Sequence, residues 1–421
     1  MLKILLFFVF FEFAFSLDAT MEIIKNKSSL PTIGVVIAND TSKVNAIDTK
    51  ILKLIKKDLQ VSGHFHDSQI TIESEFNSPP RYRILRENGL DLYLIFQMKV
   101  DLNNKYIIDT KLYDVNTTEL VLSKSYATSS LERYPFLAHK IAIDINKHLK
   151  APSIEWMDRF VIFSRYLDSK TSEIVIADYT LTYQKVVVRG GLNIFPKWAS
   201  SNQNAFYYTS YKGIVPALIK KDLYTNHSET ILTSDGMIVC SDVSEDGKKL
   251  VLTMAPNSQP DIYVYNTDTK IKTRITNYLG IDVGGSFVEN DSRIVFVSDR
   301  LKYPNIFAKK IGSSGVERMI YHGRNNSQST TSEDYIVYSS RETDNEFGSN
   351  IFNLYLISTK SDYVRRLTTN GQNQFPKFST DGESLLFIKS TDKSYLGIIR
   401  LNYNKSFLFP LNTGKLQSID W

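Results

Sequence analysis

The amino-acid sequence predicts an all-β six-bladed β-propeller preceded by a small α/β domain. Three observations lead to this fold class. One short apolar strand recurs six times, two further sequence columns recur in the same register, and residues 17–149 show a different alternation of strands and helices. A repeat of roughly 40–50 residues that carries several short strands is typical of propeller blades.

The repeat is regular. The recurring strand reads, for example, EIVIADY in its first copy and DIYVYNT in its third. Successive copies are 44 residues apart except for one step of 48. The aligned positions are Ile174, Leu218, Ile262, Ile306, Leu354 and Ile398. An anchor column contains Trp198, Val243, Phe287, Phe378 and Trp421, and a third contains Val187, Ile231, Ile275, Met319, Leu367 and Leu411. We therefore expect one blade for each repeat.

The two ends of the repeat region predict how the ring closes. The first repeat begins at Arg159–Tyr166 without an anchored strand before it, whereas the chain ends on QSIDW, Gln417–Trp421. We expect this last segment to be the innermost strand of the first blade, which leaves no seam of unpaired backbone groups. The predicted propeller spans residues 156–421.

The first 16 residues predict export. MLKILLFFVFFEFAFS contains Lys3, an apolar run and the small residues Ala14 and Ser16, as in a secretory signal peptide. No cysteine lies near this site, so we expect no lipid anchor. No later stretch approaches roughly 18 uninterrupted apolar residues, so we expect no direct membrane insertion.

The composition limits the covalent cross-links and the classes of partner that we expect for this protein. Cys240 is the only cysteine, which excludes an intramolecular disulfide, and we interpret it as a buried thiol. The net charge is +5 with both signs interspersed, so we expect no nucleic-acid partner. We expect a monomer without cofactor.

Residues 17–149 predict an α/β domain, because buried-strand patterns alternate with apolar residues at helical spacing. Short turns suggest that its last three strands form an antiparallel meander. The expected elements are a strand Ile33–Asn39, a helix Thr49–Leu59, strands Leu90–Val100, Tyr106–Val115 and Glu119–Thr128, and a helix Leu131–Leu149, followed by a linker at 150–155.

Several segments resemble the TolB family, the periplasmic component of the Tol–Pal system of Gram-negative bacteria. They are PTIGVVIAN, KDLQVSGHF, ERYPFLAHKIAIDINKHL and the propeller copies FPKWAS, VSEDGKKLVLT and FPKFSTDGESLLF. The propeller copies are similar to the family pattern Pro-x-Trp/Phe-Ser-Pro-Asp-Gly. The Asp-Gly turn is kept at Asp246-Gly247 and Asp381-Gly382, while the proline before it is missing.

The resemblance implies a periplasmic, non-enzymatic adaptor that supports outer-membrane integrity and constriction during cell division. It implies that one mouth of the propeller binds Pal, the peptidoglycan-associated lipoprotein, and that the N-terminus of the mature chain binds the inner-membrane protein TolA. The corresponding N-terminal residues are Leu17, Asp18, Ala19, Thr20, Met21, Glu22, Ile23, Ile24 and Lys25. MEIIK offers a strand for addition to a partner sheet; alternatively, it is an edge strand of its own domain.

Residues just before each innermost strand should lie together at one end of the ring. They are Leu192, Asn193, Met237, Ile238, Asp282, Asn326, Gln328, Asn373 and Gln374. An Asn/Gln-rich rim with apolar members would make an adaptable Pal-binding surface. The alternative is that these residues serve turn geometry.

Other function classes have weaker signals. His64, His66 and Asp67 could seed a metal site, although we expect none. Asp242, Asp282 and Asn326 leave open a metal-dependent lactonase-type hydrolase, and a generic secreted propeller scaffold is a further alternative. No Gly-x-Ser-x-Gly elbow is present, which argues against a serine hydrolase.

Overall fold

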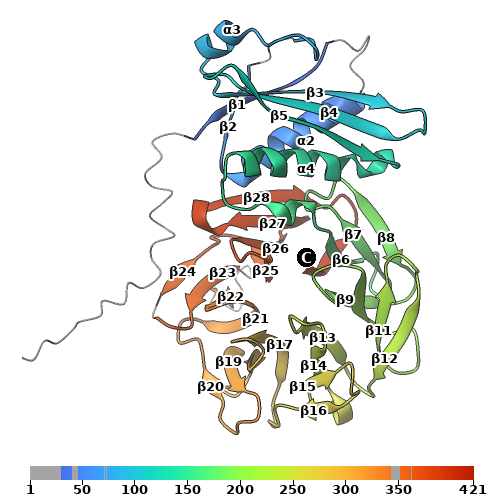
Figure 1. The fold of residues 1–421 in the computed structure, drawn as a ribbon. Coiled ribbons are helices and arrows are strands. Elements are labelled where there is room, and N and C mark those ends of the chain that lie inside the picture. The colour runs from blue at the N-terminus through green and yellow to red at the C-terminus, as the bar shows by residue number, and fades with distance from the viewer. Residues whose placement is uncertain (1–29, 40–45, 71, 73, 343–350, 362) are drawn as a thin grey trace, which may run out of the picture.

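The computed structural model describes residues 30–39, 46–70, 72, 74–342, 351–361 and 363–421. The predicted signal peptide and the segment Leu17–Lys25 lie outside the described residues. Figure 1 shows an α/β domain, coloured blue to green, beside a ring of β-sheets coloured green to red. The predicted combination of an N-terminal α/β domain and a β-propeller is confirmed.

The N-terminal domain is built on one five-stranded sheet with the order β2-β1-β3-β4-β5. Strand β1 is parallel to β2 and β3, whereas β3, β4 and β5 form the predicted antiparallel meander. The strands are β1 Thr32–Ile37, β2 His66–Asp67, β3 Leu92–Val100, β4 Tyr106–Asp114 and β5 Glu119–Thr128.

Helices cover both faces of this sheet. Helix α2 (Ala46–Ser62) and helix α4 (Tyr134–His148) share one core with the sheet. The apolar residues of α2 recur at a spacing of three and four and form one buried stripe. Helix α4 is buried on two sides, because Leu137 and Ile141 pack on the sheet while Ile143 joins the core shared with the propeller. The short helix α3 (Tyr82–Glu87), which the sequence pattern did not predict, buries Leu85 against the other face.

The propeller strands form successive antiparallel sheets arranged in a ring (Figure 1). The strands are β6 Val161–Tyr166, β7 Ser172–Ala177, β8 Gln184–Val188, β9 Asn193–Trp198, β10 Ala205–Ser210, β11 Ala217–Asp222, β12 Ser228–Thr233, β13 Ile238–Val243, β14 Lys249–Met254, β15 Asp261–Asn266, β16 Lys272–Arg274, β17 Asp282–Val288, β18 Arg293–Ser298, β19 Asn305–Lys310, β20 Glu317–Arg318, β21 Arg324–Ser332, β22 Tyr335–Arg341, β23 Phe352–Ser358, β24 Val364–Arg366, β25 Gln372–Phe378, β26 Ser384–Ser390, β27 Ser394–Arg400, β28 Lys405–Pro410 and β29 Lys415–Asp420. Single 3₁₀ turns occupy η1 Leu131–Arg133, η2 Glu155–Asp158, η3 Pro256–Ser258 and η4 Leu401–Tyr403.

Within the described residues, four propeller sheets have four strands each and one has eight. The larger sheet contains β21–β24 and β25–β28, joined by one parallel pairing between Phe352 and Gln372. Adjacent sheets bury their apolar faces against each other. Ile162 and Ile176, for example, share a core with Trp198 of the next sheet, which explains why the anchor column recurs with the strands.

The C-terminal strand completes the first sheet. Strand β29 is antiparallel to β6, from Lys415 opposite Tyr166 to Asp420 opposite Ile162. Trp421 then packs on Trp156 with ring centroids 5.3 Å apart. Its indole Nε1 donates a hydrogen bond to the carbonyl of Phe378 on β25, so the end of the chain joins the first and last sheets.

A buried charged cluster joins the two domains. His139 of α4 lies between two carboxylates, with Nδ1 2.8 Å from Asp58 Oδ2 and Nε2 3.3 Å from Asp178 Oδ2. The hydroxyl of Tyr179, in the propeller, donates to Asp58 Oδ1 at 2.6 Å. Burial alone would lower the pKa of His139, but the charges and hydrogen bonds of the two aspartates outweigh burial and raise that pKa.

Replacing Trp421 with Ala should lower the free energy of unfolding by about 3–5 kcal/mol, because it removes a buried aromatic side chain at the ring junction. Urea unfolding followed by circular dichroism measures this. Tyr224→Ala, which truncates an aromatic residue that is 72% exposed, is the matched control. Equal stability of the two variants would show that the junction does not depend on Trp421.

Replacing His139 with Gln should destabilise the protein most near pH 6. The raised folded-state pKa contributes stability that is fully present below the unfolded pKa of about 6.5 and is lost as pH rises towards the folded value. The difference in unfolding free energy between wild type and variant should therefore shrink from pH 6 to pH 9. His148→Gln, on an exposed position of the same helix, should show no such trend; a pH-independent difference for His139→Gln would contradict the assignment.

Candidate functional site in the propeller channel

A cavity of about 320 Å³ lies in the channel of the propeller. Its lining residues come mainly from the innermost strands β9, β13, β17, β21, β25 and β29. Most of these residues are apolar or small. The lining residues are Phe195, Pro196, Lys197, Met237, Val239, Cys240, Ser241, Thr253, Val283, Gly284, Ser286, Gln328, Ser329, Phe375, Pro376, Lys377, Ser418 and Ile419.

The same backbone irregularity shapes several of these strands. Each innermost strand contains a β-bulge, where two of its residues lie opposite one residue of the adjacent strand in the same sheet. Phe195 and Phe375 stand at this bulge with φ of 55° and 53°, a conformation that costs free energy for a bulky side chain. The surrounding structure holds them there, because Phe195 N donates to Ser418 Oγ at 3.1 Å and Phe375 N donates to Gln328 Oε1 at 3.0 Å.

A lysine follows each Phe-Pro pair. Lys197 Nζ lies 3.2 Å from Asp242 Oδ1 and 3.0 Å from Asp420 Oδ1. Burial by itself would lower the pKa of Lys197, but the two carboxylates outweigh it and raise that pKa. The remaining oxygens of these aspartates accept backbone N–H groups at 2.9 Å, from Phe287 and Trp198. Lys197 is therefore part of a closed, fully paired network between neighbouring sheets.

Lys377 occupies the equivalent position on β25 without such a network. Burial lowers the pKa of its ammonium, and the charge of Lys197 lowers it further. Asp420 and Asp242 act on Lys377 only through longer-range attraction, since both carboxylates are engaged elsewhere. The channel thus contains one neutralised lysine and one cation without an ion-pair partner among the described residues.

The N-terminal domain contacts the propeller at residues outside the lining of the cavity. These contacts include Tyr179, after β7, and Tyr403, after β27, and the register places both near the C-terminal ends of the innermost strands. Phe195 is the third of six residues in β9 and Phe375 is the fourth of seven in β25, so both lie near the middle of their strands. The cavity and the interface with the N-terminal domain therefore use different residues of the propeller.

The residues of the predicted rim have different surroundings in the structure. Met237 and Gln328 line the cavity, whereas Leu192 and Gln374 are half-buried outside its lining. Ile238 is buried in the core of its sheet. Asn193, Asn326 and Asn373 are buried, and their Nδ2 groups donate to the carbonyls of Gly190, His322 and Asn370, respectively. These three asparagines hold the loop that enters each strand, which favours the turn-geometry alternative for them.

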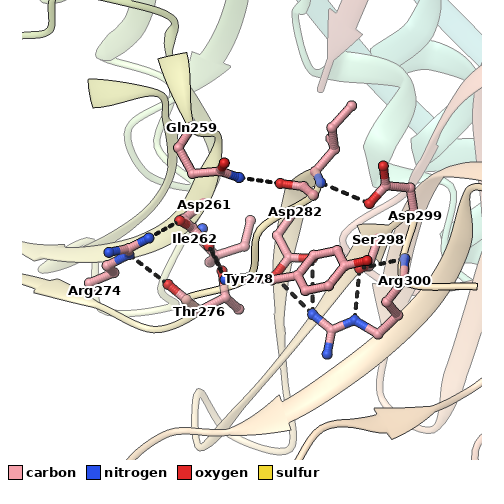
Figure 2. A network of polar contacts seen from close by, with 12 residues as sticks. Gln259, Asp261, Ile262, Arg274, Thr276, Tyr278, Asp282, Ser298, Asp299 and Arg300 are labelled. Atoms are coloured by element: carbon pink, nitrogen blue, oxygen red, sulfur yellow. Dashed lines mark hydrogen bonds and ion pairs between the residues drawn. The ribbon is translucent and has the colours of Figure 1, made fainter. Parts of the chain in front are cut away.

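Asp282 also has a structural partner. Figure 2 shows its carboxylate facing Arg300, whose Nη2 lies 3.0 and 2.9 Å from the two oxygens, while Arg300 Nε donates to Ser298 Oγ at 2.8 Å. Arg274 forms a comparable pair with Asp261 on the preceding sheet (Figure 2). Asp261 and Asp282 are both fully buried, so these ion pairs stabilise the ends of strands and the two carboxylates are not available to a ligand.

The residues considered for metal binding have other contacts. Asp242 faces Lys197, Asp282 faces Arg300, and Asn326 binds its own loop. Within the described ranges, no group of three or more His, Cys, Asp or Glu side chains is arranged to hold a metal ion. His64 instead bridges the domains, because its ring nitrogens contact Asn146 Oδ1 and the hydroxyl of Tyr403. Burial lowers the pKa of His64 to about 4.

Sequence reasoning missed Phe195 and Phe375 as site residues. The repeated Phe-Pro-Lys is present in FPKWAS and FPKFST, but these segments served only as evidence for the family resemblance. The available signal was the tripeptide Phe-Pro-Lys, which occurs at residues 195–197 and again at residues 375–377. Their position in the channel follows from the bulge, which spacing along the chain does not show.

Comparisons with known proteins agree with this architecture. The family model for the TolB beta propeller domain matches residues 159–418, and that for the TolB amino-terminal domain matches residues 19–121. A solved structure of TolB from Acinetobacter baumannii has a TM-score of 0.75 and covers 93% of this chain and 96% of that chain at 21% identity. This likeness supports the shared fold. No helix in the described part of the chain is long and apolar enough to cross a membrane.

Curated relatives share sequence over nearly the whole length. The Tol-Pal system protein TolB of Wolinella succinogenes is 49% identical over 411 residues, which cover 97% of both chains. The Tol-Pal system protein TolB of Helicobacter hepaticus is 47% identical over 411 residues, which cover 97% of this chain and 96% of the relative. The chain therefore belongs to the TolB family of Tol–Pal system proteins.

Proposed function

We propose that this Tol–Pal system protein is a non-catalytic periplasmic adaptor with two partner-binding regions. The channel cavity binds a Pal-like outer-membrane lipoprotein, and the segment Leu17–Lys25 binds a TolA-like inner-membrane protein. Residues 1–16 act as the signal peptide that directs export. The adaptor links the envelope layers and thereby supports outer-membrane integrity and constriction during division.

The channel cavity is the observation that carries this proposal. It combines aromatic, proline and methionine side chains with a few polar groups, a composition that suits protein docking. The two phenylalanines are held in a costly backbone conformation by bonds from neighbouring strands. Such strain is commonly retained where it shapes a binding site.

We propose six blades for the propeller. The eight-stranded sheet divides naturally into β21–β24 and β25–β28, because a single residue pairing joins the two halves. Each half then has the four-stranded antiparallel order of the other propeller sheets. Together with the sequence repeat, this division supports a propeller at 156–421. We propose that it follows an N-terminal domain at 17–149 and a linker at 150–155.

The N-terminal segment supports the second binding region through its sequence. In MEIIK the β-branched residues Ile23 and Ile24 lie between Glu22 and Lys25, a pattern that suits addition of a strand to the edge of a partner sheet. This region differs in kind from the channel, since it would contribute backbone hydrogen bonds, whereas the channel contributes apolar pockets.

Replacing Phe375 with Ala should weaken binding of the soluble Pal domain from the same organism by about 2 kcal/mol, or roughly 30-fold, if the side chain is an aromatic anchor. Calorimetric titration of residues 17–421 measures this, and Leu102→Ala, at a fully exposed position of the N-terminal domain, is the control. Unchanged affinity of Phe375→Ala, with wild type binding saturably, would place the Pal interface outside the channel.

Deleting residues 17–25 should abolish binding of the TolA domain while leaving binding of the Pal domain intact, because the two regions are separate. Co-elution and calorimetry with each domain measure the two interactions. A chain in which LDATMEIIK is shuffled keeps its length and composition and serves as the matched control for an unspecific tail. Loss of both interactions, accompanied by a lower unfolding temperature, would show that the segment maintains the fold.

A further inference from the structure

The two lysines of the channel occupy equivalent positions but have unequal surroundings. Lys197 and Lys377 each follow a Phe-Pro bulge, on β9 and β25, and each pairs with the same position of the next strand, Tyr207 and Leu386. Asp242 and Asp420 both neutralise Lys197. No ion pair or hydrogen bond joins the ammonium of Lys377 to any residue within the described ranges.

The strands beside β25 explain this difference. Strands β21 and β29 flank β25 around the channel. At the level of Lys377, β21 carries Thr330, which pairs with Val337, and β29 carries Asp420, which pairs with Ile162. Thr330 has no charge. The two oxygens of Asp420 are already engaged by Lys197 Nζ and by the N–H of Trp198, so Asp420 acts on Lys377 only at longer range.

The surroundings make an uncompensated ammonium unfavourable. Lys377 keeps only part of its surface accessible, and that surface faces the cavity. Burial lowers the pKa of Lys377, Lys197 lowers it further, and the more distant Asp420, Asp242 and Cys240 oppose this effect only in part. A buried cation without a partner costs free energy, and an anion brought by a ligand would remove that cost.

The walls of the cavity restrict the kind of anion. Phe195, Pro196, Met237, Phe375 and Pro376 surround the approach to Lys377. A small hydrated anion would lose its water against these apolar groups. A carboxylate on an aliphatic stem can place its stem against the walls and its charge at Lys377.

We propose that Lys377 Nζ binds an aspartate or glutamate side chain that a docking partner inserts into the channel between Phe195 and Phe375. This inference rests on the proposed function of the channel and specifies the chemistry that the partner must supply. Lys197 then has a structural role, because its two carboxylates are already present, and Lys377 has the recognition role.

The test compares Lys377→Met with Lys212→Met, which removes an exposed lysine next to the loop that enters β9. Both variants, in residues 17–421, are titrated calorimetrically with the soluble Pal domain. Lys377→Met should weaken binding roughly 10- to 100-fold, as expected for loss of one partner of a desolvated charge pair, while Lys212→Met should change it less than about threefold. Lys377→Met should also unfold at the same or a higher temperature, because it removes a half-buried ammonium that has no ion-pair partner within the described residues.

A second readout follows protonation. Because burial lowers the pKa of Lys377 and a partner carboxylate would raise it, proton uptake on binding should grow as the pH is raised through the alkaline range for the wild type, measured in buffers of different ionisation enthalpy, and Lys377→Met should lack this increase. Asp→Asn and Glu→Gln variants of the Pal domain should then identify one carboxylate whose removal weakens binding to the wild type but not to Lys377→Met, as a double-mutant cycle requires.

The outcomes separate this inference from the proposed function. Absence of binding to the wild type would overturn the proposed function itself. Binding to the wild type with equal affinity for Lys377→Met would overturn only the carboxylate assignment. Competition by millimolar acetate or phosphate, without dependence on any acidic residue of the Pal domain, would show a small-anion site instead of a docking site.

Discussion

The pairing of β29 with β6 is the constraint on which the rest of the propeller depends. Successive sheets stabilise one another by burying their apolar faces, so an open ring would expose the faces of its first and last sheets to water. Strand β29 prevents this by joining residues 415–420 to residues 162–166. Asp420 then contacts Lys197 and the N–H of Trp198, and Trp421 contacts Trp156 and Phe378. Closure therefore also shapes the channel, because one carboxylate of the closing strand neutralises a lysine of the next sheet.

The contact between the domains combines an apolar core with buried polar groups. Val61 and Ile143 of the N-terminal domain share a core with Trp156, Tyr179 and Phe409, and the Asp58–His139–Asp178 cluster lies within the same interface. A buried charge cluster requires a defined relative position of the two domains, because a small displacement leaves charges unpaired. The N-terminal domain is thereby attached to the propeller through residues that do not line the cavity.

The channel uses one motif twice with different electrostatic surroundings. The first Phe-Pro-Lys segment has a lysine with two carboxylate partners, and the second has a lysine without an ion-pair partner in the described part of the chain. The same bulge presents a phenylalanine beside each lysine. A fold that repeats one strand motif around an axis can in this way keep identical backbone geometry while neighbouring residues decide whether a side chain is structural or available to a partner.

The sequence by itself determined the class of fold, the order of the two domains and the position of most strands, because a strand repeat and helical periodicity are properties of local pattern. It also determined the family, through motifs such as PTIGVVIAN and FPKFSTDGESLLF. It did not reveal the short helix α3 or the buried state of Asn193, Asn326 and Asn373, since the same residues suit a binding rim and a loop. Only the tertiary structure decided that Phe195 and Phe375 line one cavity, and that Asp242 and Asp420 both pair with Lys197 while Lys377 has no ion-pair partner in the part of the chain that the structure describes. Those facts depend on bulges and on contacts between strands far apart in the chain, such as Lys197 and Asp420, and such contacts arise only when the ring has closed.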